Sequence, residues 1–126
     1  MANSEQLTIP RRGVDDWNQW RNENPDVRTD LSHAIFSNMY LRGADFDRAN
    51  LVQAWLNGAD LSGASLNGAL LKKVEFGGVK LNSASLMDAD VQGARFHMAD
   101  LADANLKRAD LSQAQFYWTN LAGRHL

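Results

Sequence analysis

A large apolar residue recurs at every fifth position from Leu31 to Leu121, and this period constrains the fold more than any other feature of the chain. The 19 positions hold thirteen leucines, all five phenylalanines and Val91. The residue two places before each of them is alanine in 14 cases, and seven of the nine glycines lie two places after one. A period of five fits neither the 3.6 residues of a helical turn nor the two-residue alternation of a plain strand.

The period fits a short extended segment followed by a corner. Residues two apart in an extended chain point to the same side, so the alanine and the following large residue both face inward. The residue between them and the one after face outward, and glycine is favoured at the corner because some tight turns need a positive φ. Arg48, Met98 and Trp118 also stand at this corner position, so we expect two types of turn.

Stacked coils bury the inward side chains that one extended segment leaves exposed. Parallel, in-register stacking at about 4.8 Å places identical positions above one another. At roughly 1.5–3 kcal/mol per buried side chain, the large residues contribute on the order of 30–60 kcal/mol before chain entropy is subtracted. Such a column needs no disulfide or metal, and the chain contains no cysteine.

Four runs in the repeat carry a resemblance to a known family. They are Ala44-Asp-Phe-Asp-Arg, Ala59-Asp-Leu-Ser-Gly, Ala89-Asp-Val-Gln-Gly and Ala109-Asp-Leu-Ser-Gln. These runs resemble the A(D/N)LxX motif of the pentapeptide-repeat proteins, and the resemblance extends over residues 29–126. It implies an all-β solenoid, a right-handed quadrilateral parallel β-helix with four pentapeptides per coil and just under five coils. Four phenylalanines share a phase modulo 20, which independently favours a four-sided coil: Phe36, Phe76, Phe96 and Phe116.

A short capping α-helix is predicted before the repeats. The chain then divides into a flexible N-terminal segment (1–12), the capping helix with its linker (13–28) and the pentapeptide-repeat β-helix (29–126). We expect Asp15 to be the N-cap and Pro25 to end the helix. Val14, Trp17 and Trp20 fall on one helix face, and we expect them to cover the first coil as an N-terminal cap. Helices with this Trp-x-x-Trp-Arg spacing also occur in bacterial members of the family that the chain resembles.

No capping helix is predicted after the last pentapeptide. An open coil end exposes apolar core and unpaired backbone groups, which favours edge pairing. Tyr117, Trp118 and Arg124 lie in the final coil and are the candidate self-association end. Either they fold over the open end, or this end pairs with a second copy of the chain to form a homodimer.

Catalytic, metal and cofactor sites are not predicted. The three histidines, His33, His97 and His125, lie on different faces and in different coils of a four-sided column. The aspartates that precede many of the large residues repeat with the motif, and we expect them to hydrogen-bond near the turns. The sequence contains no phosphate-binding loop and no HExxH motif. A filled core also leaves no cavity for a cofactor or a small-molecule substrate, so we expect a non-enzymatic protein.

Function is therefore expected on the outward positions of the column. Ile35 and Trp55 stand one coil apart on one face, with Val52 across the corner. The motif normally has polar residues there, so these three form the candidate interaction patch for an unidentified protein partner. Single apolar residues are common on protein surfaces, and an ordinary surface is the alternative interpretation.

The charge of the column bears on a second candidate function. Certain members of the family inhibit or protect DNA gyrase by imitating DNA, so a DNA-mimic inhibitor of this type II topoisomerase is the alternative. From residue 31 onward, nine acidic and nine basic residues balance, whereas a mimic of polyphosphate should be strongly negative. The net charge of −2 also gives no reason to expect nucleic-acid binding. Without an apolar run of about 20 residues or a signal peptide, we expect a cytoplasmic protein with no membrane partner.

Overall fold

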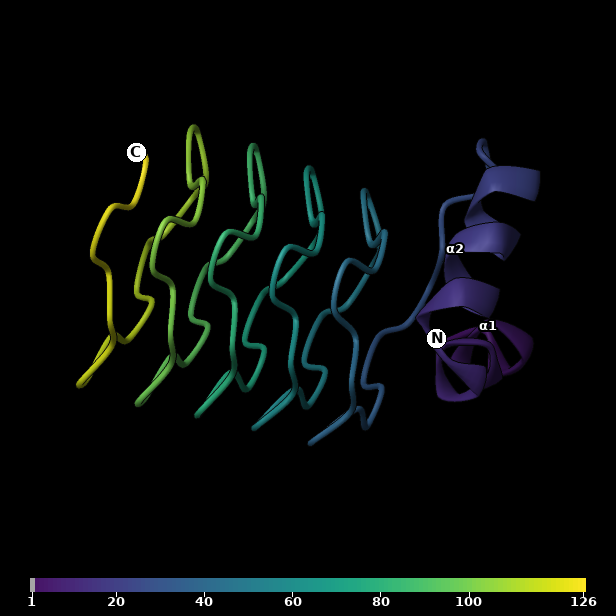
Figure 1. Ribbon diagram of the computed structural model, residues 1–126, viewed down its shortest axis with the longest axis horizontal. Helices are drawn as coiled ribbons and strands as arrows, with labels where there is room; N and C mark the ends of the chain where they lie inside the picture. The colour runs from purple at the N-terminus through teal and green to yellow at the C-terminus, as the bar shows by residue number, and fades with distance from the viewer. Residues whose placement is uncertain (1) are drawn as a thin grey trace.

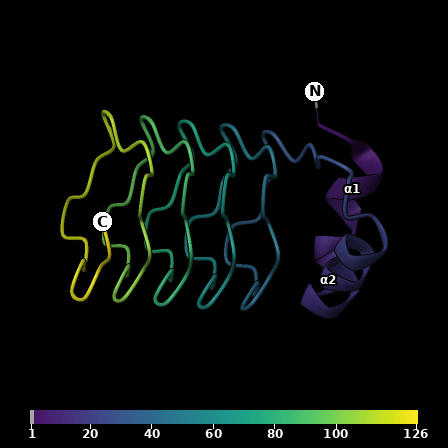
Figure 2. The ribbon, with the colours of Figure 1, turned by 90° about the horizontal axis from the view of Figure 1, so that it is seen from above.

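The computed structural model describes residues 2–126 as a helical cap at one end of a column of coils (Figure 1). The cap contains α1 (Ser4–Thr8), the 3-10 helix η1 (Pro10–Arg12) and α2 (Val14–Glu23). The last coil lies at the end of the column opposite the cap, and no other described element covers it (Figure 2). No helix among residues 2–126 combines the length and the apolar character needed to cross a membrane.

Parallel β-bridges join residues that are twenty positions apart. They run from Asp30↔Asn50 to Asn105↔His125, and within residues 2–126 they remain isolated bridges rather than extended strands. Each bridge spans four pentapeptides, so each coil has four walls. The bridged residue immediately precedes a large apolar residue, which we call the centre of its pentapeptide. The residue two places after the centre is the corner residue.

The hydrogen bonds between coils have the same polarity on every wall. The centre donates its N–H to the next coil, as in Phe36 N to Trp55 O at 2.8 Å. The corner residue does the same, as in Asn38 N to Asn57 O at 2.9 Å. One hydrogen bond runs in the opposite direction, because Trp55 N of the next coil donates to Ala34 O at 2.8 Å. The C-terminal edge of a coil therefore presents two N–H donors for each carbonyl acceptor, and the N-terminal edge presents the reverse.

The centres fill the interior of the column. Every centre from Leu31 to Leu101 is at most 1% exposed. Phe76, Phe96 and Phe116, which share a phase modulo 20, stack with ring centroids 4.8 and 5.0 Å apart. The coils therefore bury one continuous apolar core, as the five-residue period predicts.

All corner residues of the column have a positive φ, so the expectation of two turn types is wrong. Arg48, Met98 and Trp118 have φ values of 59°, 57° and 54°, close to the 69° of Gly43. Each corner is closed by a hydrogen bond between residues three apart, which with this φ is the pattern of a type II turn. A left-handed non-glycine residue costs roughly 1–2 kcal/mol. Stacking between the coils offsets this cost, because the corner N–H also donates to the next coil.

The first residues of the chain differ from the expected flexible segment 1–12. Residues 4–12 form α1 and η1, in which Gln6 is 7% exposed, and Ile9 between them is 3% exposed. The backbone N–H of Asn3 donates to Asp30 O at 2.9 Å, which ties this segment to the first coil. These contacts come from residues distant in sequence, so local patterns did not reveal them. Met1 lies outside the described residues.

The start of α2 also differs from the prediction. Gly13, and not Asp15, is the N-cap, and no side chain caps the helix. Gly13 has φ 120°, a conformation that side chains disfavour, so the helix begins directly after it. Asp15 lies in the first turn, where a negative charge interacts favourably with the helix dipole. The helix ends at Glu23, just before Pro25, as expected.

Candidate functional site

Trp17 closes the N-terminal end of the core. Its side chain is 0% exposed, and its ring lies 5.4 Å from that of Trp20 and 5.5 Å from that of Phe46. Its indole Nε1 donates to Asp45 O at 2.7 Å. Val14 and Trp20 are half-buried against the same core. The helix face that the sequence predicts as the cap therefore lies against the first coil.

Other polar groups of the cap hydrogen-bond to the backbone of the first coil. Three side-chain donors reach carbonyls: Arg11 Nη2 to Ile35 O, Asn18 Nδ2 to Gly43 O and Arg21 Nη2 to Asp47 O. Two side-chain oxygens accept from amides: Gln6 Oε1 from Asp30 N and Asn18 Oδ1 from Asp45 N. With Trp17 Nε1 and the N–H of Asn3, donors outnumber acceptors in the cap. The cap thus complements the carbonyl-rich N-terminal edge of the column.

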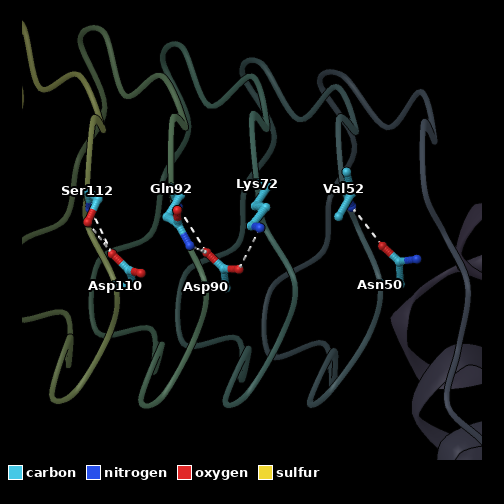
Figure 3. A network of polar contacts seen from close by, with 7 residues as sticks. All are labelled: Asn50, Val52, Lys72, Asp90, Gln92, Asp110 and Ser112. Atoms are coloured by element: carbon cyan, nitrogen blue, oxygen red, sulfur yellow. Dashed lines mark hydrogen bonds and ion pairs between the residues drawn. The ribbon is translucent and has the colours of Figure 1, made fainter.

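The wall patch, Ile35, Val52 and Trp55, lies at the start of the column. Ile35 and Trp55 form a parallel β-bridge and are 64% and 52% exposed. Val52 is half-buried on the neighbouring wall, and its N–H donates to Asn50 Oδ1 at 3.1 Å (Figure 3). The structure thus places the two exposed members on adjacent coils. Partner binding through this patch stays a prediction.

A groove follows the corner beside Trp55 along the column. It is lined from the wall by Trp55, Glu75, Arg95 and Gln115, and from the corner by Gln53, Lys73, Gly93 and Gln113. Arg95 Nη1 lies 3.1 Å from Glu75 Oε1, which is the ion pair expected from residues one coil apart. An exposed pair of this kind contributes only about 0–1 kcal/mol. Polar and charged groups of the groove therefore border the wall patch on one side.

The repeated aspartate and asparagine side chains hold the turns. Oδ1 of Asn50, Asp90 and Asp110 accepts the N–H two residues later (Figure 3). The side-chain and backbone hydrogen bonds from Ser112 hold the pKa of Asp110 below its ordinary value. Lys72 Nζ lies 3.7 Å from Asp90 Oδ2. These side chains therefore have the structural role that the sequence predicts for the repeated aspartates.

The C-terminal coil, residues 107–126, leaves its core open. Its centres Leu111, Phe116 and Leu121 are only half-buried, whereas the preceding centres are at most 2% exposed. Arg124 is exposed and stands at the inward position that alanine occupies one coil earlier, at Ala104. The apolar core of the column is therefore accessible at this end.

Two aromatic residues of the C-terminal coil are exposed and leave its half-buried centres uncovered. Tyr117 and Trp118 are 64% and 87% exposed, so the expectation that they fold over the open end is wrong. The Tyr117 ring stacks on His97 at 5.1 Å instead. Met98, 68% exposed, precedes Trp118 by one coil in the same corner. Sequence reasoning missed Met98, although its phase modulo 20 matches that of Trp118, and also missed Tyr40, which is 83% exposed.

The titratable side chains of residues 2–126 are spread over the walls of the column. His33, His97 and His125 belong to three different walls. Among residues 2–126, no group of three or more histidine, aspartate or glutamate side chains is placed to hold a metal ion. The bidentate contact between Arg108 and Asp88 joins adjacent coils, with the guanidinium lowering the pKa of the Asp88 carboxyl.

Comparison with known proteins identifies the repeat. The family model for pentapeptide repeats matches eight copies, over residues 27–63, 56–86 and 84–123. The chain is 28% identical to a pentapeptide repeat protein of the Arabidopsis thaliana thylakoid lumen, with a TM-score of 0.54 over 70% of this chain and 58% of that one. It is 30% identical to HetL, a pentapeptide repeat protein involved in heterocyst differentiation regulation in the cyanobacterium Nostoc, with a TM-score of 0.46 over 78% and 57%.

A third solved structure is less similar. QnrB1, a plasmid-mediated fluoroquinolone resistance protein, is 21% identical over 76% of this chain and 59% of its own, with a TM-score of 0.37. The chain thus spans a little under three fifths of the length of the Arabidopsis and Nostoc structures. The comparison with curated proteins gave no match.

The matched repeats coincide with the residues that form the column. The matches span residues 27–123, and the bridges join residues 30–125. The Arabidopsis structure is a pentapeptide repeat protein as well, and repeats of this family form a right-handed β-helix solenoid, which is the architecture of the column. The chain therefore belongs to the pentapeptide-repeat family.

Proposed function

We propose that the chain is a non-enzymatic interaction protein that binds a protein partner through the outer surface of its β-helix. The exposure of Ile35 and Trp55 on adjacent coils is the observation that supports this proposal. Burying such side chains in a complex releases roughly 1.5–3 kcal/mol each. Lys73, Glu75 and Arg95 border the patch in the groove, and binding sites commonly have this arrangement of an apolar centre with a polar rim.

Substitution of Trp55 tests the wall patch. The intact chain is used to capture partners from native lysate, and the captured proteins are identified by mass spectrometry. Trp55→Asp should lose the specific partner, while the matched variant Tyr40→Asp, on another wall, should retain it. Both side chains are exposed, so neither variant should change thermal stability by more than about 0.5 kcal/mol. A partner that still binds Trp55→Asp would exclude the wall patch, and a large loss of stability would make Trp55 a structural residue.

A DNA-mimic inhibitor or protector of DNA gyrase is the alternative function. The family resemblance supports it, but the balance of nine acidic and nine basic residues in the column speaks against it. Ion pairs further neutralise carboxylates on the surface, as between Arg42 and Asp60 at 3.9 Å. A supercoiling assay with purified gyrase separates the two functions. We expect no change in activity, and a change at low micromolar concentration of the chain would favour the DNA mimic.

Two further expectations remain predictions. Sedimentation velocity of the intact chain tests the homodimer through Tyr117, Trp118 and Arg124, because a concentration-independent monomer excludes it. Cell fractionation tests the cytoplasmic location, which the thylakoid-lumen origin of the Arabidopsis relative does not support.

A further inference from the structure

The groove beside the wall patch is hollowed at Gly93, a part of the groove that we call its floor. The groove has a volume of about 500 Å³, and four residues form its corner side, one from each of four successive coils: Gln53, Lys73, Gly93 and Gln113. Only Gly93 lacks a side chain, and a Cβ there would lie 3.4 Å from Lys73 Cγ. The coil of Gly93 is bridged to a coil before it and a coil after it, through Glu75↔Arg95 and Arg95↔Gln115. The floor is therefore a hollow in the continuous side of the column.

Two cations border this floor. Lys73 is exposed and has no ion-pair partner among residues 2–126, unlike Lys72, whose Nζ lies 3.7 Å from Asp90 Oδ2 (Figure 3). Arg95 is exposed one coil further on, and its Nη1 donates to Glu75 Oε1 at 3.1 Å. A guanidinium has five N–H donors, so Arg95 keeps donors for a ligand. The groove therefore contains two cations and one carboxylate, which leaves an excess of positive charge.

This excess of charge is local, and it favours a ligand with a single carboxylate. Over the whole column, nine acidic and nine basic residues balance, so a nucleic acid gains no general attraction. A carboxylate over Gly93 can instead accept from Lys73 and Arg95 together. Hydrogen bonds between a carboxylate and such cations are roughly twice as strong as neutral ones.

The distance from the floor to Trp55 matches the repeat of an extended peptide. Trp55 is 52% exposed and lies one coil before Glu75, while Arg95 lies one coil after it. With coils about 4.8 Å apart, a carboxylate between the coils of Lys73 and Arg95 lies about 7 Å along the column from Trp55. Side chains two residues apart in an extended chain lie on the same side and about 6.6–6.8 Å apart. Two such side chains can therefore occupy the wall patch and the floor together.

We propose that the groove binds an extended segment of a partner protein that carries an apolar residue and, two positions away, an aspartate or glutamate. The apolar side chain covers Trp55, and the carboxylate lies over Gly93 between Lys73 and Arg95. This inference rests on the proposed binding of a protein partner at the wall patch and adds the chemistry of the segment that binds there.

Selection from a random peptide library displayed on phage, with the intact chain as target, tests this site. The selected peptides should be enriched in an apolar residue with Asp or Glu two positions away. The affinity of a labelled selected peptide should fall by about tenfold or more in Lys73→Glu, because attraction is replaced by repulsion. Lys80→Glu is the matched control, since Lys80 is an exposed lysine on another wall, and it should leave the affinity unchanged. Affinity for the natural chain should also fall with salt.

Gly93→Gln tests the floor without a change of charge. Gln53 and Gln113 stand at the same corner with φ values of 59° and 61°, so the column accommodates glutamine at this register position. The added side chain should fill the floor and weaken the peptide as much as Lys73→Glu does. Gly78→Gln, at a different corner, should leave the affinity unchanged. Circular dichroism melting checks that the glutamine variants remain folded.

Several results would overturn the proposal. These are a failure to select any peptide, selected peptides without an acidic bias, and unchanged affinity for Lys73→Glu or for folded Gly93→Gln. A concentration-dependent dimer in sedimentation that Lys73→Glu abolishes would assign the groove to a second copy of the chain. Tighter binding of a single-stranded oligonucleotide than of the selected peptides would assign it to nucleic acid.

Capture from lysate separates this inference from the proposed function. A partner that is lost by Trp55→Asp and retained by Lys73→Glu would support the wall patch and refute the acidic segment. A partner that both variants retain would refute the wall patch and the inference together. Loss of the partner with both variants, but not with Lys80→Glu, is the result that we expect.

Discussion

Removing the Trp17 side chain should destabilise the column from its capped end. Trp17→Ala removes a fully buried ring that contacts Trp20 and Phe46. Truncation of a buried tryptophan typically costs about 3–5 kcal/mol, through lost burial and the cavity that remains. The same variant leaves Asp45 O without its indole donor. We therefore expect a loss in the upper part of that range.

Trp17→Phe separates the packing from the hydrogen bond. Phenylalanine retains an aromatic ring over Phe46 but has no donor for Asp45 O, which now accepts at 2.7 Å. A buried polar group left without its partner costs about 1–3 kcal/mol, so this variant should lie between the natural chain and Trp17→Ala. Trp20→Ala is the matched control, because Trp20 is half-buried and makes no such bond.

Urea denaturation measures these differences. Circular dichroism reports on the coils, and tryptophan fluorescence reports mainly on the ends, so coincident transitions are needed before a single free energy of unfolding is assigned. The midpoint should fall in the order natural chain, Trp17→Phe, Trp17→Ala. If Trp17→Ala unfolds within about 0.5 kcal/mol of the natural chain, the cap does not stabilise the column and our account of the N-terminal edge is wrong.

Three other perturbations test separate features of the column. Lys73 has a φ of 57°, which is unfavourable for a residue with a side chain, so Lys73→Gly should raise the free energy of unfolding in urea denaturation by about 0.5–1 kcal/mol. The gain is expected because the cost of the left-handed conformation exceeds the extra entropy that glycine gives the unfolded chain. A loss of stability would contradict this. The pKa values of Asp88 and Asp110 are lowered in the fold, so their contribution is complete above the unfolded value and is lost as pH falls below about 4. Melting temperature should therefore drop in acid, and less so in Asp110→Asn. Deletion of residues 2–26 should expose the carbonyl-rich edge and produce head-to-tail chains that grow with concentration in sedimentation; a monomer would refute the edge polarity.

The column could be predicted from the sequence because its periodicity repeats one local rule. The centre and the residue two places before it, which is alanine in 14 of the 19 repeats, face inward, and this repetition leaves little ambiguity about what is buried. The corner conformation could not be predicted in the same way. Residues such as Arg48 do not favour positive φ by themselves, and only the hydrogen bonds between stacked coils hold them there.

The cap was predicted only in part, for a related physical reason. Trp17 and Trp20 share a helical face, and the pattern located that face correctly. Helix α1 has five residues and η1 has three, too few to form without tertiary contacts. The two short helices are held in place by hydrogen bonds such as the one from Asp30 N to Gln6 Oε1, which joins residues 24 positions apart. No local pattern contains that information.

The candidate sites were also predictable only where a local or periodic pattern determines them. The phase modulo 20 placed Ile35 beside Trp55 on adjacent coils, which the β-bridge confirms. The donor surplus of the C-terminal edge could not be found from side-chain types, since it arises from backbone groups whose partners depend on the direction of stacking.

The polarity of the hydrogen bonds gives the two ends of the column different chemistry. Each coil donates two N–H groups to the next coil for every hydrogen bond that it accepts from that coil. The N-terminal edge of the column therefore needs donors, and the C-terminal edge needs acceptors. Two columns can satisfy each other's edges only head to tail, an arrangement that would continue into an open chain. The cap prevents this, because Trp17 and its neighbouring donors occupy the N-terminal edge.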